Sequence, residues 1–125
     1  MRNAELGIMN ENVILNKSKT FALEIIELYK YLCEEKHEYI LSKQILRSGT
    51  SIGANAREGS RAQSKADFLS KMSVSLKEAD ETAYWLELLH ESCYIDKERF
   101  TGLHKDCDEL IRILTSITKT TKSNS

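Results

Sequence analysis

Proline is absent from all 125 residues of this chain. Because proline removes a backbone donor and clashes with the preceding turn of a helix, its absence suits a chain that is helical almost throughout. Long apolar runs are also absent, so no segment approaches the ~18–20 residues that span a membrane. The first residues, which include Glu5 and Glu11, do not have the pattern of a signal peptide. We therefore expect a cytoplasmic protein without a membrane segment.

Cysteine is scarce, and Cys33, Cys93 and Cys107 contain no Cys-x-x-Cys spacing, which argues against a disulfide framework or a zinc site. The formal net charge is only −1, which argues against a strong, general nucleic-acid binder. The charges are nonetheless separated along the chain. Residues 43–77 carry seven basic and two acidic residues, whereas residues 78–98 carry seven acidic residues and one basic residue.

Apolar residues recur at steps of three and four over four segments, which is the pattern of amphipathic helices that face a common core. The expected helices run from about 18 to 35, 40 to 58, 64 to 90 and 97 to 119, and Ser64 and Asp96 are typical N-terminal caps. Short connections predict an all-α, antiparallel up-down-up-down four-helix bundle over residues 17–119. We expect a flexible N-terminal arm over 1–16 and a disordered tail over 120–125.

Small residues are concentrated in the second predicted helix, where Gly49 and Gly53 lie four residues apart. A glycine inside a helix costs about 1 kcal/mol, so the pair predicts a close backbone approach, within the bundle or between subunits. The third helix is apolar at every position of Ala83–Leu89 except Glu87, which is typical of a helix buried on more than one side. The expected oligomer interface comprises Gly49, Gly53, Tyr84, Trp85 and Leu88. Packing against the N-terminal arm is the alternative for the last three.

Basic residues flank the expected turn between the second and third helices. A multimer would repeat them around a ring, which would raise avidity for phosphates without any strong single contact. The segment has no aromatic residues for base stacking, which argues against sequence-specific recognition of single strands. The alternative is a solvated face offset by nearby acids. The predicted nucleic-acid-binding residues are Arg47, Arg57, Arg61, Lys65 and Lys71.

Three polar residues, Asn55, Glu58 and Glu81, lie in the same central stretch. We expect them to have a structural role, since a buried and paired Asn or Glu commonly fixes the register between helices.

Two patterns point to chemistry, and both are incomplete. Glu-x-x-His pairs occur at Glu34/His37 and Glu87/His90, but the second helix offers no glutamate to complete a di-iron carboxylate site, so no metal site is predicted. Arg99 and His104 resemble the catalytic pair of small helical, metal-independent RNases. The residue after Arg99 is Phe100, where those enzymes usually carry a polar group. We therefore predict no catalytic residue, no cofactor and no small-molecule substrate, and keep an RNase that uses Arg99 and His104 as an alternative.

The runs QILRSGTSIGAN, EGS, SKADF and ETAYWLELL resemble the 23S rRNA intervening-sequence proteins, a family of four-helix bundles, and the resemblance covers roughly Phe21 to Leu114. It implies a homopentamer. A related branch, the accessory proteins of diversity-generating retroelements, forms a basic pentameric barrel that contacts nucleic acid and a reverse transcriptase. The chain departs from the family at 55–59, where Asn-Ala-Arg-Glu-Gly replaces the common Asn-Ile-Ala-Glu-Gly.

The leading hypothesis is a non-enzymatic oligomer that presents a ring of basic residues to RNA, DNA or a nucleoprotein partner. A protein–protein scaffold without nucleic acid is the alternative.

Overall fold

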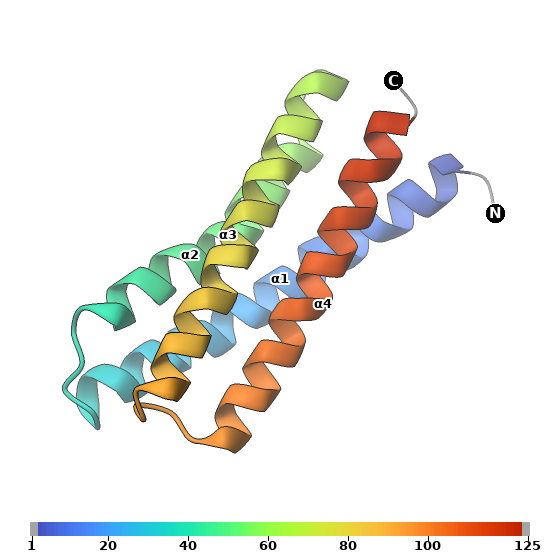
Figure 1. The fold of residues 1–125 in the computed structure, drawn as a ribbon. Coiled ribbons are helices and arrows are strands. Elements are labelled where there is room, and N and C mark those ends of the chain that lie inside the picture. Colours follow the sequence, from blue (N-terminus) through green and yellow to red (C-terminus); the bar gives the residue numbers. More distant parts are fainter. Residues whose placement is uncertain (1–2, 124–125) are drawn as a thin grey trace.

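Four long helices account for most of the chain in the computed structural model, which describes residues 3–123. They are α1 (Asn3–Glu34), α2 (Leu41–Ser60), α3 (Lys65–Glu91) and α4 (Lys97–Ser123). Each helix packs against its neighbours in sequence, and α1 also packs against α4. Figure 1 shows that the helices alternate in direction, so the α2–α3 turn lies at the end opposite the other two connections. The predicted all-α, up-down-up-down bundle is confirmed.

The first helix begins much earlier than its predicted start near Ser18. Residues 3–16, where we expected a flexible arm, continue α1, and Ile14 is fully buried in the core. Ser18 is also fully buried. The buried positions Ile14, Ser18 and Phe21 are therefore spaced by four and three residues, as in one continuous helix. Because Ser18 is polar, a search for apolar residues alone did not detect this continuity.

The last helix also exceeds its predicted end, because residues 120–123 of the expected tail belong to α4. The expected arm and tail also include residues 1–2 and 124–125, which lie outside the described residues.

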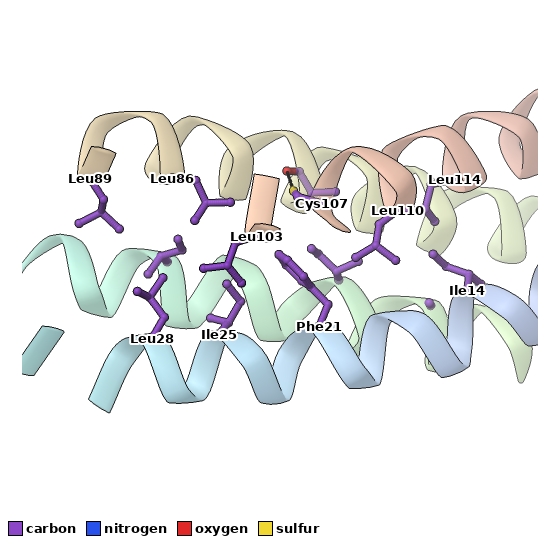
Figure 2. Packing of buried hydrophobic residues seen from close by; sticks show 14 of the residues in the cluster. Ile14, Phe21, Ile25, Leu28, Leu86, Leu89, Leu103, Cys107, Leu110 and Leu114 are labelled. Atoms are coloured by element: carbon purple, nitrogen blue, oxygen red, sulfur yellow. Dashed lines mark hydrogen bonds between the residues drawn. The ribbon is translucent and has the colours of Figure 1, made fainter. Parts of the chain in front are cut away.

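A single hydrophobic core runs along the bundle (Figure 2). Phe21 and Ile25 point inward from α1, while Leu103 and Leu110 point inward from α4. Phe21, Ile25 and Leu110 are at most 1% exposed. Burial of each such side chain stabilises the fold by roughly 1.5–3 kcal/mol, so this core is the main source of stability.

The two glycines of α2 face α1 within the same chain. A Cβ atom on Gly49 would lie 2.9 Å from both Cγ atoms of Ile25, and one on Gly53 would lie 3.0 Å from Ser18 Oγ. Gly49 is buried within the single chain. The structure thus shows, for both glycines, the close backbone approach within the bundle, and a contact with another subunit stays a prediction.

Buried hydroxyl groups link α2 to α3. Ser75 Oγ donates to the Ile52 carbonyl at 2.7 Å, and Thr82 Oγ1 lies 2.8 Å from Ser48 Oγ. Ser48, Ser75 and Thr82 are fully buried. Because a small hydroxyl side chain can bond to the neighbouring backbone only at short range, these contacts hold the two helices close together and fix their register.

The three polar residues that we expected to have a structural role contribute little to the buried part of this register. Asn55 donates to the Ser51 carbonyl of its own helix at 2.9 Å. Glu58 and Glu81 are exposed rather than buried. Glu58 nonetheless links α2 to α3 at the surface, because its Oε1 lies 3.4 Å from Lys71 Nζ.

A third buried contact joins α3 to α4. Cys107 Sγ donates to the Ala79 carbonyl at 3.2 Å (Figure 2). Burial, with a smaller effect from the carboxylates of Asp108 and Asp80, raises the pKa of the Cys107 thiol to about 12. The thiol is therefore a neutral core group.

The connection between α1 and α2 contains a buried glutamate. The carboxylate of Glu38 accepts hydrogen bonds from the amides of Leu41 at 3.1 Å and Ser42 at 2.8 Å. These amides lie in the first turn of α2, where backbone donors have no partner within the helix. The short connection between the two helices thus supplies acceptors for the first turn of α2.

We expect Gly49→Ala to destabilise the bundle by roughly 1–3 kcal/mol, because the new methyl group would overlap Ile25 in a packed core. Gly102→Ala is the matched control. A Cβ atom at this helical position meets nothing within 4 Å, so the change should stabilise by about 0.5–1 kcal/mol through helix propensity. Urea unfolding measures both effects. Equal effects of the two substitutions would contradict the proposed close packing of α1 and α2.

Candidate nucleic-acid interface

Basic side chains follow the solvent face of α2. Lys43, Arg47, Arg57 and Arg61 are all exposed. At 1.5 Å per residue, the row from Lys43 to Arg61 is about 27 Å long. Of the predicted binding residues, Arg47 and Arg57 thus lie on the outer surface of α2, and Arg61 is the C-terminal cap that follows its last residue.

The predicted group is more extended than a cluster at the α2–α3 turn. Arg57, Arg61 and Lys65 lie at that end of the bundle, whereas Arg47 lies about 15 Å from Arg57 along the helix axis. Arg47 also faces α3, where its positive charge opposes the rise in the pKa of Glu78 that burial and Glu81 cause.

Lys71 on α3 is engaged with an acid of α2. Its Nζ lies 3.4 Å from Glu58 Oε1, and both side chains are partly exposed to solvent. A surface ion pair of this kind contributes about 0–1 kcal/mol. The positive charge of Lys71 thus offsets the negative charge of Glu58, the acid next to Arg57 in the sequence.

A groove of about 540 Å³ lies between α1 and α2, beside the basic end of α2. Its lining includes three exposed cations, Lys19, Arg57 and Arg61, and one exposed carboxylate, Glu58. Lys19 lies on α1 and was not among the predicted residues. It lies 38 residues before Arg57 in the sequence, so only the packing of α1 against α2 brings the two together.

Small side chains make this groove possible. Its lining also contains Ala22 of α1 together with Thr50, Gly53 and Ala54 of α2. Since none of these side chains extends far from its helix, the surface between the helices remains hollow. The described lining contains no aromatic residue, so the groove offers cations and a shallow floor without a stacking platform for bases.

Arg99 and His104 are not brought together within the chain. The Arg99 guanidinium carbon lies 4.1 Å from the ring centroid of Tyr31 on α1. His104 instead faces α3, where its Nε2 lies 3.6 Å from Glu87 Oε2. Each side chain therefore contacts a different neighbouring helix, and one chain alone does not form the RNase pair.

Aromatic side chains mark the outer surface of α3. Tyr84 is 53% exposed, and its ring centroid lies 5.2 Å from that of Trp85. Trp85 is half-buried and packs against the core, and Leu88 is half-buried. Within the described residues, Trp85 Nε1 is buried without a hydrogen-bond partner. Of the three α3 residues among those predicted to contact another subunit, Tyr84 is thus the most accessible.

Acidic residues gather between α1 and α4. A hollow of about 500 Å³ is lined by Glu24, Glu27, Glu98 and Asp106, among other residues. Burial raises the pKa of Glu24, and the nearby carboxyl of Asp106, which is also its hydrogen-bond partner, raises it further. Only Glu98 of these four residues belongs to the acidic stretch 78–98 of the sequence, so the packing of α1 against α4 creates this acidic surface, whereas the exposed cations lie along α2.

In residues 3–123, which the structure describes, no three His, Cys, Asp or Glu side chains are grouped so that they could hold a metal ion. None of the four helices contains an apolar stretch long enough to cross a membrane.

The fold and sequence together define the class of protein. The chain belongs to the 23S rRNA-intervening sequence protein family, whose sequence profile matches residues 10–116. Among solved structures it is similar to a protein of unknown function from the S23 ribosomal protein family of Bacteroides thetaiotaomicron. The two are 52% identical with a TM-score of 0.87, and the match covers 88% of this chain and 98% of the other. No curated protein matches the chain.

The acidic surface yields a prediction about pH. Because the pKa of Glu24 is raised in the folded chain, its ionisation opposes folding, and its contribution to the free energy of unfolding falls as pH rises through the carboxyl range. We therefore expect Glu24→Gln to stabilise the chain near neutral pH. The gain should disappear below about pH 4.5, the ordinary value for this group.

Glu27→Gln is the matched control, because Glu27 lines the same hollow and lies 3.7 Å from Lys30 on its own helix. Urea unfolding over a range of pH should show no comparable stabilisation for this variant. A gain for Glu24→Gln that persists at low pH would contradict the electrostatic explanation.

Proposed function

We propose that the protein is a non-enzymatic oligomer that binds the phosphate backbone of nucleic acid through the basic surface of α2. The observation that carries this proposal is the groove between α1 and α2, where Lys19, Arg57 and Arg61 surround one shallow hollow. Lys65, which opens α3 at the same end of the bundle, extends this surface. In this proposal the packed helices hold these four cationic side chains on one surface.

The charges favour phosphate contacts over base contacts. Arg57 and Arg61 are exposed, and Glu58, the acid between them in sequence, is paired with Lys71. Cations that contact phosphates release condensed counterions, which makes binding steeply dependent on salt. No aromatic residue lines the groove, so binding should depend little on base sequence.

A single copy of this surface is small, which is why the proposal includes an oligomer. A few phosphate contacts give weak binding, whereas several linked copies bind with avidity. Tyr84 on α3, beside Trp85 and the partly exposed Leu88, supplies an apolar surface suited to a second copy. We take the number of copies as five, as the resemblance to the pentameric relatives implies.

A protein–protein scaffold without nucleic acid is the second candidate. The acidic surface between α1 and α4 favours it, since the carboxylates of Glu24 and Asp106 would repel a phosphate backbone on that side. The two candidate functions differ in the role of the cations of α2, which are needed to bind nucleic acid but not to bind a protein partner through the acidic surface.

We expect the double substitution Arg57→Glu/Arg61→Glu to weaken RNA and DNA binding at least tenfold, because it replaces two attractive charges with two repulsive ones. Lys105→Glu/Arg112→Glu makes the same change of charge on the exposed surface of α4 and is the control. Fluorescence anisotropy at two salt concentrations measures both variants. Equal losses in the two variants would support a general effect of net charge, and no loss in either would favour the scaffold.

Tyr84→Glu should reduce the solution mass measured by light scattering to that of a folded monomer. The side chain is 53% exposed in the single chain, so the change should leave the bundle itself folded. Thr101→Glu, at an exposed position of α4, is the control and should keep the parent's mass. A parent protein that is itself monomeric would disprove the oligomer.

A further inference from the structure

The groove between α1 and α2 combines cations with hydrogen-bond acceptors, and this combination distinguishes between nucleic acids. We propose that this groove binds the ribose–phosphate backbone of RNA in preference to the backbone of DNA, an inference that rests on the proposed function. Lys19, Arg57 and Arg61 contact phosphates, and Thr50 accepts a hydrogen bond from a ribose 2′-hydroxyl.

The cations come from two helices, which places phosphates across the groove. Lys19 lies on α1, whereas Arg57 lies on α2 and Arg61 caps its C-terminal end, and all three line the same hollow of about 540 Å³. A backbone that lies between the helices is therefore flanked by positive charge on both sides. These contacts are common to RNA and DNA, because the two backbones carry the same phosphates.

The hydroxyl of Thr50 distinguishes RNA from DNA in this proposal. Its Oγ1 donates to the Leu46 carbonyl of the preceding turn at 2.7 Å, so its proton is used within α2. The oxygen can then only accept from a ligand in the groove. Phosphates offer acceptors alone and cannot bond to it. The ribose 2′-hydroxyl is a donor as well as an acceptor, and DNA lacks it.

The absence of larger side chains beside Thr50 allows a sugar to approach. Gly53 and Ala54 follow it on α2 and line the same hollow. A Cβ atom on Gly53 would already lie 3.0 Å from Ser18 Oγ, so the helices are closely packed beneath the groove. The floor is thus shallow and rigid, and a backbone can reach the Thr50 oxygen without entering the core.

The test compares an RNA oligonucleotide with the DNA oligonucleotide of the same sequence by fluorescence anisotropy with the full chain. We expect the parent to bind RNA more tightly by roughly three- to tenfold, the ratio that one such hydrogen bond per site supplies. Thr50→Val removes the hydroxyl at nearly constant shape, so RNA binding should fall to the level of DNA while DNA binding is unchanged. Thr50→Ser should keep the preference.

Ser51→Ala is the matched control. Ser51 Oγ donates to the Arg47 carbonyl at 2.6 Å, as Thr50 does to Leu46, but Ser51 does not line the groove. Its removal should leave the RNA preference intact. Lys19→Glu should weaken RNA and DNA binding by the same factor, because Lys19 contacts only phosphate.

Equal binding of RNA and DNA by the parent, or a preference that survives in Thr50→Val, would overturn this inference. Neither result would touch the proposed function, because phosphate binding is tested separately by Arg57→Glu/Arg61→Glu and its control: a double variant that binds both nucleic acids as tightly as the parent would contradict the proposed function and leave the RNA preference without a site.

Discussion

The close approach of α2 to both of its neighbours is the constraint on which the rest of this bundle depends. Gly49 places the backbone of α2 against Ile25 of α1, and Ser75 of α3 donates a hydrogen bond to the α2 backbone at Ile52. A helix with so few large side chains adds little volume to the core. The other three helices therefore fill it with large residues such as Phe21 and Leu110 (Figure 2).

The same choice of small residues shapes the outer surface. Gly53 and Ala54, which cannot extend over the gap between α1 and α2, leave a groove where larger side chains would have covered the helices. The cations that border this groove face little negative charge. Glu58 is the one acidic residue of α2, and the positive charge of Lys71 offsets it. Packing inside the bundle and the form of the proposed binding surface thus have a common origin in one helix.

Periodicity in the sequence was enough to predict four antiparallel helices, because most core positions are occupied by aliphatic residues at regular steps. It failed where polar residues occupy core positions. Ser18 interrupted the apolar pattern of α1 and moved its predicted start by several turns, and Ser75 gave no indication that it is buried. Conversely, Glu58, for which a structural role was expected, is exposed and pairs with Lys71 at the surface, since residue type alone does not show toward which side of a helix a side chain points.

The candidate site could be predicted only in part for a related reason. Arg57 and Arg61 lie four residues apart at the C-terminal end of α2, so their proximity follows from their spacing in the sequence alone. Lys19 joins them only through the packing of α1 against α2, which no local pattern encodes. Thr50 is likewise an ordinary helical threonine until its position on the groove is known. The interface between subunits stays a prediction that rests on the exposure of Tyr84.

The burial of Cys107 gives the chain an internal measure of how often the bundle opens. A thiol reacts as its thiolate, and this thiol is both fully buried and far from ionising at neutral pH. Cys93, by contrast, is exposed in the α3–α4 turn. With the half-buried Cys33 replaced by alanine, a thiol reagent should therefore modify Cys93 at once and Cys107 only when α4 separates from α3, so the slow phase reports the free energy of that local opening. A ligand that binds the closed bundle more tightly than the opened one slows this phase, so the same reaction registers such binding without any added label.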